Sequence, residues 1–448
     1  MLERESTAGG TFLDRALLNP IEDTNRTFYY VVGALLLLFL VAVGMYAHQI
    51  WFGLGVTGMN QPMTWGFYIV NFVFFIGISH AGTLISAILR LSMAEWRRPI
   101  TRMAEVITAI VLAIGGLHPI IDLGRPDRVM NVFTAGRLQS PLLWDVVSIS
   151  AYFTASTVYL YIPLIPDIAL LRDRGAKPQW LYAFLAWGWQ GTPHQHKVLD
   201  RAINILMVMV IPIAVSVHTV ISYIFSMTLQ PGWHSTIFGP YFVVGAIFSG
   251  IGALLVVMIV FRKVFHFEAY LKEIHFAYLG NLLLLMSLLW FYFTFSEYLT
   301  GFFGHEPFEM KVFWYKFVGP YAPYFWAMVA CNFFIPVVLL TFKKHHTIPK
   351  VLVSAIAVII GMWLERLIII VPTLANTHLA DPVGIYIPSL VEWGLFLGGI
   401  VAFVLGFVLF SKFFPLISVW EIQEGRERSV KDVTERLQRY LPVHQQHA

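Results

Sequence analysis

Long apolar runs dominate this chain and set its architecture. Each is long enough, or nearly so, to cross a hydrocarbon layer of roughly 30 Å as a helix. Lipid cannot satisfy bare backbone polar groups, so helices are expected in all of them. The runs cover residues 31–50, 67–89, 104–121, 146–171, 202–229, 241–261, 276–295, 324–342, 348–371 and 393–410. The pattern predicts an all-α polytopic membrane protein with about ten transmembrane helices.

Composition supports this prediction and excludes several other classes. Of the 448 residues, 58% are hydrophobic and 12% are charged, against roughly 25% charged in soluble proteins. The single cysteine, Cys331, excludes a disulfide framework, a paired-cysteine metal site and haem attached through two thiols. Any iron–sulfur cluster is therefore expected in a partner. The polar residues 1–27 resemble neither a cleaved signal peptide nor a transit peptide.

The basic residues are distributed unevenly between the two sides of the predicted membrane. With the N-terminus inside, 24 of the 30 Lys and Arg residues fall on inner segments, and Arg366 lies within a predicted helix. This positive-inside bias predicts that both termini are cytoplasmic and that the number of helices is even. The sequence has a basic pI of about 9.0 because its Lys and Arg residues lie in membrane loops. Nucleic acid is therefore not an expected partner.

A faint internal repeat suggests how the helices are grouped. Residues 65–90 align without gaps with residues 238–263, and residues 140–144 resemble residues 322–326. We therefore predict two four-helix bundles, helices 2–5 and 6–9, flanked by helices 1 and 10. The predicted divisions are an N-terminal arm (1–27), helix 1 and its loop (28–63), the first bundle (64–230), the second bundle (231–375), helix 10 (376–415) and a C-terminal tail (416–448). The charged tail has the spacing of a surface helix, for which partner docking and plain solvation are equally reasonable roles.

Ionisable side chains at membrane depth are costly, so each is a functional candidate. His118 and Asp122 lie one turn apart at the outer end of helix 3, and Asp145 lies at the outer end of helix 4. A histidine backed by carboxylates suits a site that accepts a hydroxyl proton and releases it outward. As structural alternatives, Asp122 could cap its helix and pair with Arg125 or Arg128, and Asp145 could interact with the helix dipole.

Two histidines fall deeper in the first bundle. His80 lies near the middle of helix 2, and His218 lies in the outer half of helix 5. They could form a proton relay, act as hydrogen-bonded structural histidines or ligate a b-type haem. The sequence leaves these three roles open.

The second bundle carries its own ionisable set. Glu297 lies on helix 7, Glu365 and Arg366 on helix 9, and Glu392 at the start of helix 10. Arg366 must be paired at this depth, and its neighbour Glu365 is expected to face another way, so Glu297 or Glu392 is the predicted partner. These residues are proton-transfer candidates, with a structural ion pair as the alternative. On the inner side the candidates are His80, His275 and Glu105, the last of which is expected at the interface.

Four strings resemble the NrfD/PsrC-like integral membrane subunits, and in particular the ActC subunits of alternative complex III. They are residues 137–145 (RLQSPLLWD), 171–174 (LRDR), 216–220 (SVHTV) and 231–238 (PGWHSTIF). The resemblance extends over all ten predicted helices. It implies a menaquinol oxidoreductase assembly of the bacterial inner membrane, in which this subunit holds no redox cofactor, menaquinol is the substrate, and electrons pass to iron–sulfur clusters and haem c in partners.

The resemblance also implies partners and a site. The partners are an iron–sulfur (ActB-like) subunit, a homologous NrfD-like (ActF-like) subunit and multihaem cytochromes c. Quinol would bind His118, Asp122 and Asp145, with its ring held by aromatic side chains such as Trp65, Tyr68 or Trp144. Related subunits tend to carry histidine where this chain has Asp122, and the histidine here is one turn away.

Other functions are also compatible with the sequence. An NrfD-type anchor would feed quinol electrons to a polysulfide or molybdopterin reductase. A secondary transporter would carry broken helices at matching positions of the two bundles, and the sequence contains no such glycine- and proline-marked pair. A dihaem cytochrome b is a further alternative, and coupling of quinol oxidation to proton translocation is an open question.

Overall fold

A computed structural model describes residues 12–22, 24–60, 63–80, 82, 85–342, 347–376 and 385–427. Within these ranges every regular element is a helix, and there is no strand. Nine helices there are long and apolar enough to cross a membrane, and the shorter apolar α3 (Phe67–His80) occupies the second predicted span. The prediction of an all-α membrane protein with about ten transmembrane helices is confirmed.

The nine long spans follow the predicted order. They are α2 (Arg26–Phe52), α5 (Thr101–Asp122), α7 (Pro141–Asp173), α9 (Pro193–Ser226), α10 (Phe238–Val264), α11 (Glu273–Gly304), the stretch from α13 to α14 (Ala322–Leu340), α15 (Ile348–Ala375) and α16 (Leu390–Phe413). Several extend past the apolar runs because polar first and last turns continue the helix into the interface.

Two spans are less regular than their apolar runs suggest. The second is divided into α3 and α4 (Ser86–Leu91), and a Cβ at Gly82 between them would collide with the Ala104 carbonyl oxygen of α5. In the eighth, a π-helical turn at Ala330–Phe334 separates α13 (Ala322–Val329) from α14 (Ile335–Leu340). The repeat pairs these spans with α10 and α7, which are continuous. Among the described residues, therefore, no matched pair of broken helices supports a transporter.

The helices of each predicted bundle pack against one another. In the first, α3 contacts α5 and α9, and α7 contacts α5 and α9; in the second, α10, α11, α14 and α15 pack together. The helix α10 also packs against α3 and α9, so it joins the two groups. The flanking helices α2 and α16 pair with each other, and α16 covers α5. The first and last spans are therefore neighbours.

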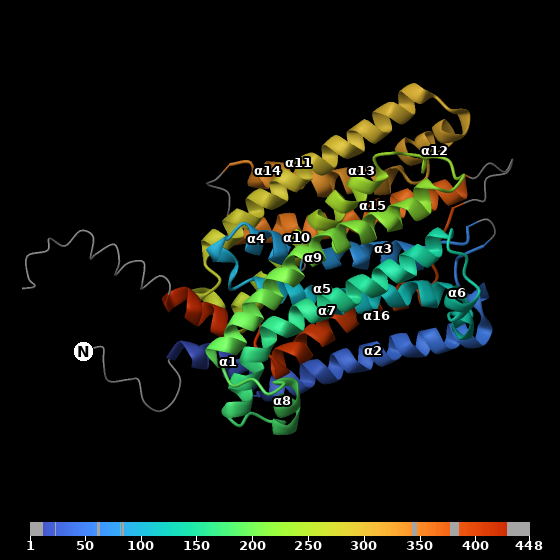
Figure 1. Ribbon diagram of the computed structural model, residues 1–448. Helices are drawn as coiled ribbons and strands as arrows, with labels where there is room; N and C mark the ends of the chain where they lie inside the picture. The colour runs from blue at the N-terminus through green and yellow to red at the C-terminus, as the bar shows by residue number, and fades with distance from the viewer. Residues whose placement is uncertain are drawn as a thin grey trace, which may run out of the picture.

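The two ends of the helix assembly carry different short elements (Figure 1). At one end, here called the basic end, lie α1 (Phe12–Glu22), α4 and α8 (Gln179–Leu185). At the opposite end lie α6 (Asn131–Thr134) and α12 (Pro307–Phe317). This arrangement agrees with the alternating loops of the predicted topology.

The chain folds back onto the basic end after α16, where residues 419–427 are helical. Asp167 pairs with Arg102 and accepts hydrogen bonds from the backbone N–H groups of Val419 and Trp420. Buried Glu421 forms ion pairs with Arg90 and Arg97 at 2.7 and 2.9 Å. The sequence predicted a surface helix here, but its first turn is an anchored, buried segment. Residues 428–448 of the predicted tail lie outside the described residues.

Candidate functional site

An apolar cavity of about 540 Å³ lies in the first bundle, near the end opposite the basic end. This end is called the opposite end below. Its walls come from α3, α5, α6, α7 and α9, together with Trp65, which precedes α3. The Trp65 indole stacks on Trp233 at 6.3 Å and meets Phe225 edge-on at 6.0 Å. This aromatic wall holds one side of the cavity rigid.

Two carboxylates interrupt the apolar lining. Asp122 ends α5 and Asp145 is the fifth residue of α7, so packing of α5 against α7 brings both to one cavity. An Oδ1 atom of each is buried without a hydrogen-bond partner. The structural alternative for Asp122 required Arg125 or Arg128, but Arg125 pairs instead with Asp127. Both carboxylates therefore keep unused acceptor capacity beside the cavity, and buried groups of this kind usually find a partner.

His118 is buried beside this site rather than in its wall. Its Nδ1 lies 2.9 Å from the Ile114 carbonyl oxygen, and its Nε2 has no partner. The ring packs 5.3 Å from that of Phe75. His118 is thus one turn below Asp122, facing α3 and away from the lining.

The other two predicted aromatic contacts point elsewhere. Tyr68 is buried and donates its hydroxyl to Gln49 of α2. Trp144 is exposed and donates its indole N–H to the Leu138 carbonyl oxygen. Of the predicted aromatic residues, the structure brings only Trp65 to the cavity. Phe225, which was not predicted, also lines it, and its only sequence signal was an apolar position near the outer end of helix 5.

The two mid-membrane histidines are in direct contact. The ring centroids of His80 and His218 are 3.8 Å apart. His80 Nε2 lies 2.7 Å from the Ala214 carbonyl oxygen, whereas neither ring nitrogen of His218 has a partner. Rings in contact leave no room for a porphyrin between them, so this geometry does not suit paired axial ligation. The relay and structural roles remain.

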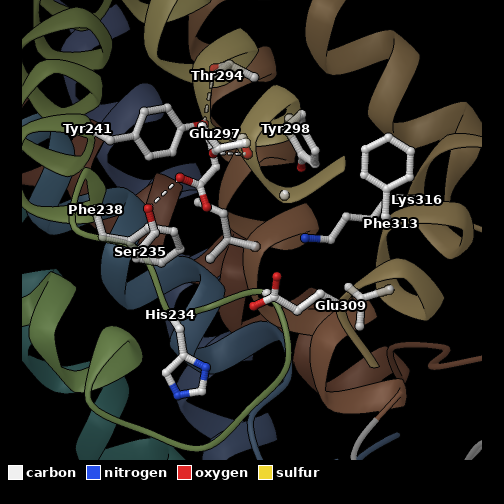
Figure 2. Close-up of a pocket in the computed structure, with 15 residues that line it drawn as sticks. His234, Ser235, Phe238, Tyr241, Thr294, Glu297, Tyr298, Glu309, Phe313 and Lys316 are labelled. Atoms are coloured by element: carbon white, nitrogen blue, oxygen red, sulfur yellow. Dashed lines mark hydrogen bonds between the residues drawn. The ribbon is translucent and has the colours of Figure 1, made fainter. Parts of the chain in front are cut away.

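A second, smaller cavity of about 270 Å³ lies at the same end of the second bundle (Figure 2). Glu297 lines it and accepts a hydrogen bond from Ser235. The side chains of Lys316 and Glu309 extend from α12 toward its middle. Neither residue was among the predicted site residues, because nothing local showed that α12 folds back over the bundle.

The predicted partner of Arg366 was wrong. Arg366 Nη1 lies 2.9 Å from Oε2 of the adjacent Glu365, and both side chains are buried. Glu297 and Glu392 are engaged elsewhere, by Ser235 and by Tyr386. The long side chains of neighbouring helix positions can bend toward each other, and here Glu365 also accepts a hydrogen bond from the Trp290 indole. The guanidinium also lies 4.8 Å from the centre of the Phe242 ring, a cation–π arrangement.

The last two candidates have well-defined structural contacts. Glu392 completes a capping box with Ser389 and accepts from the Gly58 N–H at 2.7 Å. Glu105 was expected at the interface but is buried, and it accepts from Ser86 at 2.7 Å. No cluster of three or more potential metal ligands occurs among the residues that the structure describes.

Comparison with known proteins identifies the family. The family model described as polysulphide reductase, NrfD, matches residues 55–377. A putative membrane subunit of the dimethyl sulfoxide reductase of Halobacterium salinarum is 30% identical over 254 residues, covering 56% of this chain and 55% of the relative. The chain thus spans about half the length of that relative.

Two further relatives match almost end to end. An Hdr-like menaquinol oxidoreductase integral membrane subunit of Archaeoglobus fulgidus is 23% identical over 91% of this chain and 96% of its own length. A selenate reductase subunit of Mesobacillus selenatarsenatis is 24% identical over the same shares, 91% and 96%. All three relatives are named as subunits of oxidoreductases. With the family model matching well over half of its length, this chain belongs to the polysulphide reductase NrfD family.

Proposed function

We propose that this chain is the quinol-binding membrane subunit of a menaquinol oxidoreductase, and that quinol is oxidised in the cavity of the first bundle. The observation that carries the proposal is the pair of carboxylates, Asp122 and Asp145, set in an otherwise apolar cavity of about 540 Å³. Ligand pockets of this size with a few convergent polar groups are typical small-molecule sites. The name of the Archaeoglobus fulgidus relative supports menaquinol as the substrate.

The cavity matches both parts of a quinol. Its aromatic wall at Trp65 and Phe225 suits a flat ring, and each carboxylate offers an acceptor to a ring hydroxyl. At the mouth, Phe133, Leu142 and Phe153 are exposed to the surroundings of the bundle, so an isoprenoid tail would leave the site through apolar side chains.

The same carboxylates would accept the protons of the quinol and release them. As the quinol gives up two electrons to a partner, Asp145 and Asp122 accept its hydroxyl protons and release them toward the opposite end. In the predicted topology that end is the outer face. His118, one turn from Asp122, is proposed to act on the site through its free Nε2 as a positioning residue.

The electrons require a partner in this proposal. No described group of side chains would hold a metal cluster, and the relatives are named as subunits of larger enzymes. We assign the chain to an alternative complex III arrangement, with an iron–sulfur subunit, a homologous membrane subunit and multihaem cytochromes c as partners. A second candidate is the membrane anchor of a terminal reductase, which the names of the dimethyl sulfoxide and selenate reductase relatives favour.

Site variants of the assembled complex test the quinol proposal. Asp145→Asn and Asp122→Asn should each lower quinol-dependent electron transfer at least tenfold, because an amide cannot accept the hydroxyl proton. Asp127→Asn is the matched control, since Asp127 is an exposed carboxylate at the same end. Full activity in both cavity variants, and in His118→Ala, would overturn the site.

Purification in mild detergent separates the two assemblies. An iron–sulfur protein with multihaem cytochromes c in the purified complex would support alternative complex III. A molybdopterin reductase would support the anchor. A chain that purifies without any redox partner and lacks quinol activity would contradict both.

A further inference from the structure

The small cavity of the second bundle contains a buried lysine without an ionic partner. Lys316 is 6% exposed and lies on α12, outside the membrane spans. No salt bridge or hydrogen bond joins its ammonium to another described residue, and the nearest ring, that of Tyr298, is centred 5.8 Å away. Figure 2 shows the amine pointing into the cavity. A buried charge in this position needs a ligand, water or loss of its proton.

The groups around Lys316 limit what that ligand can be. Glu297 and Tyr298 face it from α11, Glu309 comes from its own helix, and His234 comes from the loop before α10. An anion would be repelled by the two carboxylates, and a metal cation by the ammonium. Water and exchangeable protons are compatible with both signs of charge, and a volume of about 270 Å³ holds several waters.

The cavity also reaches a buried charged pair. Tyr241 lines the cavity, and its hydroxyl lies 3.4 Å from Thr294 Oγ1. The same Tyr241 side chain lies close to Glu365, which is paired with Arg366. A series of polar groups therefore leads from the cavity to the centre of the second bundle.

We infer that this cavity is a proton-exchange site, in which Lys316 and Glu297 exchange protons with water at the opposite end and Tyr241 connects them to the Glu365–Arg366 pair. Hydronium protonates the Lys316 amine and leaves water; the ammonium then protonates Glu297 through cavity water, giving back an amine and a carboxylic acid. Glu297 in turn passes this proton through water to the Tyr241 oxygen as the Tyr241 hydrogen passes to Glu365, which leaves a Glu297 carboxylate and a Glu365 carboxylic acid. No oxidant or reductant takes part.

The protonation state of Lys316 suits this role. Burial lowers the pKa of Lys316 to about 8, and the Glu297 carboxylate opposes this only in part. The amine is therefore present in both forms near neutral to mildly alkaline pH. An ordinary exposed lysine would remain charged throughout that range.

Competitive labelling of the native full-length chain tests the exchange site directly. In sealed vesicles of known orientation, a membrane-impermeant amine reagent is added to one side at a series of pH values, and labelling is read by mass spectrometry. We expect Lys316 to react from the opposite-end side only, with a midpoint near pH 8, and Lys311 of the same helix to serve as the exposed reference. An unreactive Lys316, or one that follows Lys311 at every pH, would overturn the exchange site.

Infrared difference spectra between pH 7 and 9 test the inward connection. The carboxyl signal of Glu365, assigned with Glu365→Gln, should change between these pH values in the wild type and in Lys311→Met. In Lys316→Met and in Tyr241→Phe that change should fall severalfold. If both variants match the Lys311→Met control, the connection is refuted. Neither measurement uses quinol, so the quinol proposal and this one can fail independently.

Discussion

Arg366 and Glu365, adjacent residues of α15, form a buried ion pair with 2.9 Å between Nη1 and Oε2. Arg366 also faces the junction of the two bundles, where a Cβ at Gly245 of α10 would lie 2.9 Å from Nη2. The glycine is what allows α10 to approach the guanidinium. The pair is therefore enclosed by core helices.

Breaking this pair should destabilise the protein more than removing it. Arg366→Met leaves the Glu365 carboxylate buried without its partner, which typically costs about 3–5 kcal/mol. The double variant Glu365→Gln with Arg366→Met should recover most of that loss. Denaturant unfolding in detergent would measure both, with the exposed Arg128→Met as a control expected within roughly 0.5 kcal/mol of wild type. Equal losses in the single and double variants would contradict the pairing.

Filling the first cavity should block quinol without disturbing the fold. Gly116 lines the cavity, and nothing lies within 4 Å of the position that its Cβ would occupy. Gly116→Leu should therefore place its side chain where the quinol ring binds and reduce quinol-dependent activity at least tenfold. Gly44→Leu on α2 is the matched control, because Gly44 also has open space around it but faces away from the cavity. Unchanged activity in Gly116→Leu would remove this cavity from consideration.

The histidine pair should respond asymmetrically to substitution. His80 bonds the Ala214 carbonyl oxygen, so His80→Leu should cost about 1–3 kcal/mol. His218 has no partner for either nitrogen, so His218→Leu should be neutral or stabilising. Thermal unfolding measures stability, and proton release per electron in proteoliposomes measures function. Loss of proton transfer in a stable His218→Leu would favour the relay, whereas normal proton release would favour the structural role.

The anchor at the basic end should weaken in acid. Burial by itself would raise the pKa of Glu421, but Arg90 and Arg97 outweigh it and hold the pKa below its ordinary value near 4.5. The folded state therefore favours the carboxylate, and its contribution is complete above that ordinary value and is lost as the pH falls through the lowered folded value. Limited proteolysis of residues 419–427 between pH 7 and 3 should show progressive release. Glu421→Gln should be released already at pH 7, whereas the exposed Glu427→Gln should follow the wild type.

The sequence predicted how deep each candidate lies, and part of the site followed from that depth. Helix rise is constant along an apolar span, so Asp122 and Asp145 could be assigned to one end of neighbouring helices. They do line one cavity together with Trp65. Tyr68, Trp144 and His118 were predicted at suitable depths, but their side chains face other helices or the surface. Rotation about the helix axis depends on packing, which a nearly uniform apolar sequence does not encode clearly.

By itself, the sequence determined the number and order of the spans, the predicted side of each loop and the family. Lipid requires long apolar helices, and Lys and Arg residues concentrate in the cytoplasmic loops. Only the tertiary structure decided which polar groups meet. It brought His80 against His218, turned Arg366 toward Glu365 and folded Lys316 of α12 over the second cavity. Contacts of this kind join helices whose apolar faces look alike in sequence. Close packing, with glycines at the points of nearest approach, selects one pairing among them.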